Sequence, residues 1–155
     1  MLPNAPVFMV NPRQRFIGLH RAVGANTRFS LDVITYLDPE SLSYYDAEGT
    51  IWSFRFDPPV SAFSVFLRFL ATSFRIPVPP VAITWTALRT YNIDELRRHY
   101  LDAIAVDDDI LTQFVESEEL GARVRACTTF EDLVDAWTWQ STDDTGRDVE
   151  NIFAE

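Results

Sequence analysis

The chain has 155 residues, of which 47% are apolar and 23% charged, and its formal net charge at pH 7 is −10. This length is typical of one domain with a substantial buried core, and the apolar fraction is too high for a disordered chain. A strongly negative protein repels the phosphate backbone of nucleic acid, so we expect no nucleic-acid ligand. The charged partner that it would attract is a basic protein. Solubility alone is the simpler explanation of the charge.

The N-terminal segment predicts two short strands. Residues 7–10 and 16–19 are apolar runs separated by Asn11 and Pro12, which together are a turn signal. The first ten residues contain two prolines and no basic stretch ahead of a long apolar run. They predict neither an export signal nor a membrane span, so we expect the protein to remain in the cytoplasm.

The next segments predict an antiparallel meander. Residues 29–37 alternate apolar and polar side chains and end at an Asp-Pro turn, and residues 42–45 and 51–56 follow as further strands. The turn between the last two contains Gly49, which accepts a positive φ without a steric penalty. Residues 81–86 alternate again, which predicts a fourth strand that returns to the sheet.

A helix is predicted between the meander and the fourth strand, because apolar side chains recur there at the spacing i, i+3, i+4, i+7. We expect this face to be buried against Trp52, Phe54 and Phe56 of the sheet. The apolar positions of the predicted helix are Phe63, Phe66, Leu67, Leu70 and Phe74.

The remainder of the chain predicts further helices. Residues 92–95 have the spacing of an N-cap followed by an acidic residue, and the helix that they begin reaches about Ala105. The acidic residues 107–109 predict the cap of another helix, which contains the apolar residues Ile110, Leu111, Phe114 and Val115. Residues 128–131 repeat the capping-box spacing before the last helix. Residues 141–155 are polar and acidic, which predicts a loose tail.

These elements together predict a single α+β domain over residues 1–155. We expect an antiparallel meander of about four to five strands, with three to four helices packed on one face of the sheet. No internal repeat, linker or low-complexity tract divides the chain.

The string Phe16-Ile17-Gly18-Leu19-His20 resembles the strand around the nicotinamide-pocket histidine of diphtheria-type ADP-ribosylating toxins. The resemblance covers this string alone, and Arg21 stands where that family has Gly. It implies a small effector enzyme whose site would combine His20 and Arg21 with Tyr44 or Tyr45 and a distant Glu. This enzyme is our alternative hypothesis of function.

Three residues of the helix that starts near residue 93 have the spacing of a site. Glu95, His99 and Asp102 stand at i, i+4, i+7 and would share one helix face, which is the geometry of a His oriented by carboxylates or of a partial metal site. Arg97 and Arg98 beside them favour a solvated, salt-bridged surface, which is our prediction.

Cys127 is the single cysteine, so it forms no internal disulfide, and one Cys with two His residues cannot complete the usual zinc ligand set. Its position beside a predicted helix N-terminus is one that lowers a thiol pKa, but we favour a buried structural Cys. Phosphate-binding loops and hydrolase motifs are absent from the sequence. We therefore expect no catalytic residue, no metal and no cofactor.

The lack of a catalytic set, the charge of −10 and a run of acidic residues favour a non-enzymatic protein that binds a basic partner protein. In general character this is similar to the small acidic immunity proteins that bacteria make against toxins, although no motif carries that similarity. A structural role in a phage or secretion assembly is a further alternative. The candidate interface residues are the carboxylates Asp107, Asp108, Asp109, Glu116, Glu118 and Glu119 and the aromatic anchor Trp139.

Overall fold

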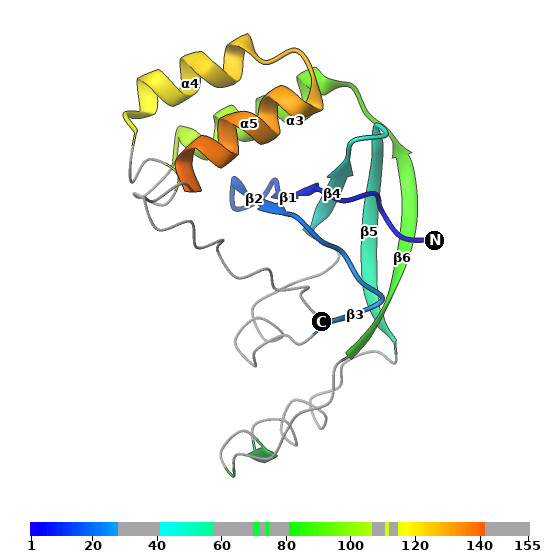
Figure 1. Cartoon of the computed structure of the whole chain (residues 1–155). Coiled ribbons are helices and arrows are strands. Elements are labelled where there is room, and N and C mark those ends of the chain that lie inside the picture. Colours follow the sequence, from blue (N-terminus) through cyan, green and yellow to red (C-terminus); the bar gives the residue numbers. More distant parts are fainter. Residues whose placement is uncertain are drawn as a thin grey trace.

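The computed structural model describes residues 1–27, 41–57, 70–71, 74, 81–106, 111 and 115–141. In these parts of the chain, six strands form one sheet and three helices follow the last strand (Figure 1). The strands are β1 (Val7–Asn11), β2 (Phe16–His20), β3 (Asn26–Thr27), β4 (Ser43–Asp46), β5 (Thr50–Asp57) and β6 (Val81–Thr90), and the helices are α3 (Ile93–Ile104), α4 (Ser117–Ala126) and α5 (Phe130–Ser141).

The sheet has the strand order β2-β1-β4-β5-β6-β3, and every neighbouring pair is antiparallel. The consecutive strands β4, β5 and β6 form a meander, in which Phe54 lies opposite Trp85. The β1–β2 hairpin joins the meander through β1, whose Phe8 lies opposite Tyr45 of β4. The strand predicted over residues 29–37 lies outside the described residues, and the place beside β4 that a simple meander would give it is taken by β1.

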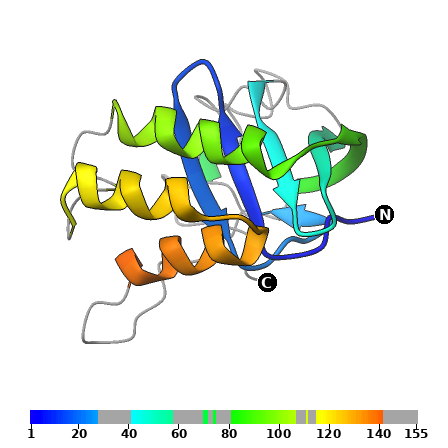
Figure 2. The same cartoon turned by 90° about the horizontal axis from the view of Figure 1, so that it is seen from above.

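The helices α3, α4 and α5 lie together over one face of the sheet (Figure 2). They and the sheet bury a common apolar core, so the predicted α+β architecture, with helices on one face of an antiparallel sheet, is confirmed. The residues of this core are Phe8, Val10, Ile17, Tyr45, Ile51, Leu96, Tyr100, Ala103, Ile104, Leu111, Val115, Leu120, Val124, Cys127, Phe130, Leu133 and Ala136.

The opposite face of the sheet buries a second, more aromatic cluster. Successive side chains of a strand point to opposite faces, so Tyr45 joins the helix-side core while Tyr44 joins this aromatic cluster. The aromatic cluster contains Val7, Met9, Leu42, Tyr44, Trp52, Phe54, Phe56, Ile83 and Trp85.

The helix starts confirm two of the predicted caps, one of them with a shift. The side chain of Asn92 accepts a hydrogen bond from the backbone N–H of Glu95 (3.0 Å), as predicted for α3. At α5 the reciprocal bonds join Thr129 and Asp132, one residue later than predicted: the Thr129 hydroxyl accepts from the Asp132 N–H (3.1 Å), and the Asp132 carboxylate accepts from the Thr129 N–H (2.9 Å).

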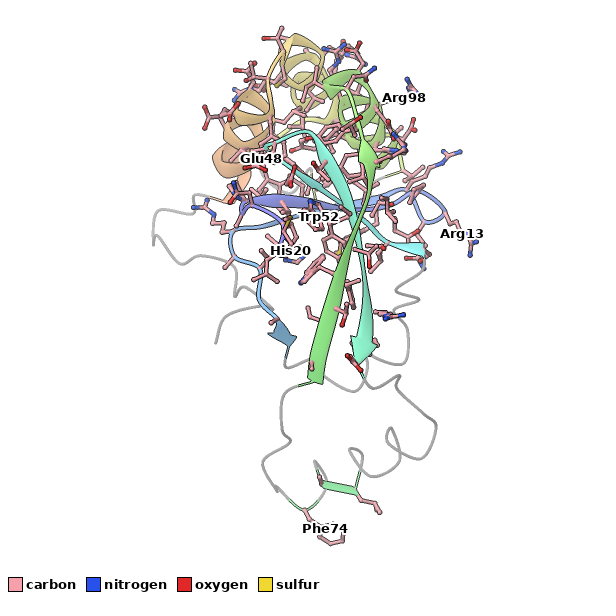
Figure 3. All side chains as sticks on the ribbon, turned by 90° about the vertical axis from the view of Figure 1, so that its right-hand side faces the viewer. Arg13, His20, Glu48, Trp52, Phe74 and Arg98 are labelled. Carbon is pink, nitrogen blue, oxygen red and sulfur yellow. The ribbon has the colours of Figure 1, made fainter. Side chains whose placement is uncertain are left out.

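The predicted helix at residues 63–74 lies mostly outside the described residues. Leu70 and Ala71 are helical, and the N–H of Phe74 donates to the carbonyl of Leu70 (3.0 Å). Phe74 itself lies in a turn with 73% of its surface exposed, far from Arg98 on α3 (Figure 3). Its predicted burial against the sheet is therefore wrong, because Phe74 lies in an exposed turn.

The start of α4 also differs from the prediction. Leu111 and Val115, which were assigned to a helix capped by residues 107–109, are buried in bends, and α4 begins only at Ser117. Both apolar side chains enter the helix-side core. Leu111 and Val115 are therefore buried outside a helix, and residues 107–110 and 112–114 lie outside the described residues.

Candidate functional site

The helical layer brings carboxylates from separate segments to one of its ends. The helices α3 and α4 are antiparallel neighbours, so the last turn of α3 lies beside the first turn of α4, and the last turn of α5 lies at the same end (Figures 1 and 2). Asp102 on α3 and Glu116, Glu118 and Glu119 at the start of α4 are exposed there. These four residues are called the acidic end.

Three of the four carboxylates of the acidic end form no ion pair within the described residues. Asp102, Glu116 and Glu118 take part in no ion pair within the described ranges, whereas Glu119 accepts a hydrogen bond from Arg123 of the same helix (2.7 Å). Glu116 is the N-cap residue of α4, yet its side chain makes no capping hydrogen bond. The charge of these three side chains is thus not neutralised by the parts of the chain that the structure describes.

Three carboxylates at the opposite end of the layer are engaged. Asp94 pairs with Arg97 (2.5 Å), and Glu95 pairs with Arg89 of β6. The Asp132 carboxylate accepts from the N–H groups of the two residues that precede α5, which lowers its pKa. In the described helices, Asp94, Glu95 and Asp132 are therefore engaged at one end, where Glu131 is exposed without an ion pair, whereas Asp102, Glu116 and Glu118 form no ion pair at the acidic end.

Helix dipoles reinforce this difference. The last turns of α3 and α5 contain no basic residue, so the negative ends of both dipoles point toward the acidic end without a compensating cation on those turns. Glu118 and Glu119 in the first turn of α4 also stabilise that helix through its positive end. Val106, which follows α3, is 46% exposed and adds apolar surface beside Asp102.

Four of the seven candidate interface residues lie in segments that the structure describes. Glu116, Glu118 and Glu119 are exposed at the start of α4, as an interface requires, and Trp139 lies toward the C-terminal end of α5, which is at the same end of the layer. Asp107–Asp109 belong to the segment between α3 and α4 and lie outside the described residues. The three predicted carboxylates that the structure describes therefore lie at the end of the helical layer where α5 ends.

Asp102 was assigned to a different group by its sequence spacing. The triplet Glu95, His99 and Asp102 is not one solvated surface: only Asp102 is exposed, while His99 is half-buried with its ring centroid 5.9 Å from that of Tyr45. Desolvation of His99 lowers its pKa. The antiparallel packing of α3 on α4 is what joins Asp102 to the acidic end, and no local spacing indicates that contact.

Glu95 is held by the sheet and not by the neighbouring arginines of its own helix. Arg89 of β6 donates to both carboxylate oxygens (2.5 and 2.9 Å), and the Tyr45 hydroxyl donates to Oε1 (3.1 Å). The hydrogen bond from Arg89 is the main reason that the pKa of Glu95 is lowered. Since all three groups satisfy one another, the cluster fixes α3 on the sheet and has the character of a structural contact.

The residues of the enzymatic hypothesis divide between the two faces of the sheet. His20 lies near Tyr44 on the aromatic side, with ring centroids 6.4 Å apart, and both side chains are buried. Burial lowers the pKa of His20 to about 4. Tyr45, which donates to Glu95, lies on the helix side. His20 is therefore brought together with Tyr44 and not with Tyr45, and Arg21 is exposed at the end of β2.

Cys127 is the predicted buried structural residue. Its thiol donates to the carbonyl of Arg123 (3.3 Å), and burial, followed by the nearby Asp132 carboxylate, raises its pKa. Among the described side chains, no group of three His, Cys, Asp or Glu residues is arranged to hold a metal ion. None of the described helices is long and apolar enough to cross a membrane.

No protein-family model, curated protein or solved structure matches this chain. The arrangement of its own residues is therefore the basis of the functional proposal.

Proposed function

We propose that this chain is a non-enzymatic protein-binding module that engages a basic partner protein through its acidic end. The supporting observation is the segregation of charge in the helical layer. Asp102, Glu116 and Glu118 are exposed together and form no ion pair within the described residues, whereas the carboxylates of Asp94 and Glu95 at the other end are paired.

The acidic end acts first on the encounter between the two proteins. The exposed carboxylates, together with the net charge of −10 on the whole chain, attract a basic surface and accelerate association. Salt weakens this attraction, because the Debye length is about 10 Å at 0.1 M ionic strength. The negative dipole ends of α3 and α5 add to this potential and the positive end of α4 offsets part of it, so the carboxylates themselves supply the main attraction for a basic partner.

Apolar contacts then hold the complex. Val106 is exposed beside Asp102, and Trp139 on α5 is the aromatic residue that we assign as the anchor. Aromatic residues dominate binding energy when they fill a pocket, whereas charges at the rim mainly set the association rate. This division of roles suits an inhibitor or immunity-type protein that neutralises a basic protein in the cytoplasm.

The test compares one charge reversal at each end of the helical layer. Glu118 and Glu131 are exposed glutamates in the first turn of α4 and α5, respectively, so Glu118→Arg and Glu131→Arg alter the charge and the helix dipole alike. The partner is first captured from a lysate of the native host at low and high salt. Association and dissociation rates of the purified pair are then measured for both variants.

We expect Glu118→Arg to slow association severalfold at low salt and Glu131→Arg to have a much smaller effect. Both effects should shrink at 0.5 M salt. Truncation of Trp139 to Ala should instead accelerate dissociation with little change in the association rate. Equal association rates for the two reversals, or rates that do not respond to salt, would contradict binding through the acidic end.

A further inference from the structure

We draw no further inference here: the strongest candidate, the exposed outer edge of strand β6 from Thr86 to Thr90, is interrupted by a register shift at Leu88, and nothing in the structure shows what covers it.

Discussion

The two faces of the sheet differ in aromatic content and also use their polar groups differently. On the helix side, Tyr45 donates to Glu95 of α3, so a polar contact links two layers of the fold. On the aromatic side, Trp52 Nε1 donates to Asp46 (2.7 Å) and Trp85 Nε1 donates to the carbonyl of Gly24 (2.9 Å). These contacts join parts of the sheet and its connections to one another.

This difference separates two tasks. Polar contacts on the helix side determine how α3 sits on the sheet, and hence where the acidic end is presented. Polar contacts on the aromatic side hold the β4–β5 turn and the segment before β3 in place. Buried polar groups are costly unless they are satisfied, so loss of a partner on either face is measurable as lost stability. The expected cost depends on how completely the partner is buried.

The largest effect is expected at Asp46, which has no exposed surface. Its carboxylate accepts from Trp52 Nε1 (2.7 Å) and from the N–H groups of Thr50 (2.8 Å) and Glu48 (3.1 Å). Asp46→Ala removes all three acceptor contacts and leaves the buried indole N–H unsatisfied. We expect a loss of about 3 kcal/mol or more in the free energy of unfolding, measured by urea denaturation.

The control for this prediction is Glu48→Ala in the same turn, since the Glu48 side chain is exposed and accepts a hydrogen bond only from Asn4 among the described residues. We expect a change within about 0.5 kcal/mol. If Asp46→Ala is no more destabilising than Glu48→Ala, the carboxylate does not hold the turn and the assignment of its polar contacts to the aromatic side is wrong.

Local signals in the sequence predicted the individual helices and strands better than they predicted which of these elements pack against one another. The Asn92 cap of α3 was predicted because an N-cap bond joins residues three apart in sequence. The α5 cap is shifted by one residue because the Asp132 carboxylate accepts hydrogen bonds from the N–H groups of both Thr128 and Thr129. The spacing of the residues alone does not indicate this double hydrogen bond. The pairing of β1 with β4 is a contact between distant segments, and neither strand's pattern encodes it.

The candidate site was predictable only in part for the same reason. The run of acidic residues between 107 and 119 identified Glu116, Glu118 and Glu119 as candidate interface carboxylates. Asp102 joins them only because α3 and α4 pack antiparallel, which is a tertiary property. Arg89 was not predicted as the partner of Glu95, because Arg97 and Arg98 are nearer in sequence and the approach of β6 to α3 has no sequence signal.

The second largest effect should appear on acidification and involve His20 on the aromatic side. Burial lowers its pKa from 6.5 to about 4, so between these pH values the unfolded chain binds a proton that the folded chain does not. Stability is therefore complete above pH 6.5 and falls as the pH decreases toward 4. At pH 5 the loss from this group amounts to about 2 kcal/mol relative to neutral pH.

His20→Gln should remove this dependence, which urea denaturation at pH 7.5, 6 and 5 would show as a shallower loss of stability than in the original chain. His99→Gln is the matched control on the helix side, where the pKa of the half-buried His99 is lowered less. We expect it to retain most of the pH dependence. If His99→Gln reduces the pH dependence of stability more than His20→Gln does, the aromatic side is not the main source of the acid-induced loss.

The smallest effect is expected for two tyrosine hydroxyls, one of which donates to a carboxylate and the other to a backbone carbonyl. Tyr45 donates to Glu95 (3.1 Å), whereas Tyr91 donates to the backbone carbonyl of Asp46 (2.6 Å). Each Tyr→Phe change should cost about 1 kcal/mol at neutral pH, measured by urea denaturation. The carboxylate acceptor titrates and the carbonyl does not, so the two costs should differ in their pH dependence.

The pKa of Glu95 is lowered, chiefly by its hydrogen bond with Arg89, so the charged acceptor is fully present above the ordinary carboxyl pKa and is lost as the pH falls through the lowered value. The cost of Tyr45→Phe should therefore be constant from pH 7 to 5 and shrink below pH 4, because a protonated carboxyl is a weaker acceptor. The cost of Tyr91→Phe should remain constant over the same range. If the two costs follow the same pH dependence, the Tyr45–Glu95 hydrogen bond does not contribute to the attachment of α3 to the sheet, and Arg89 is the polar group that holds Glu95 there.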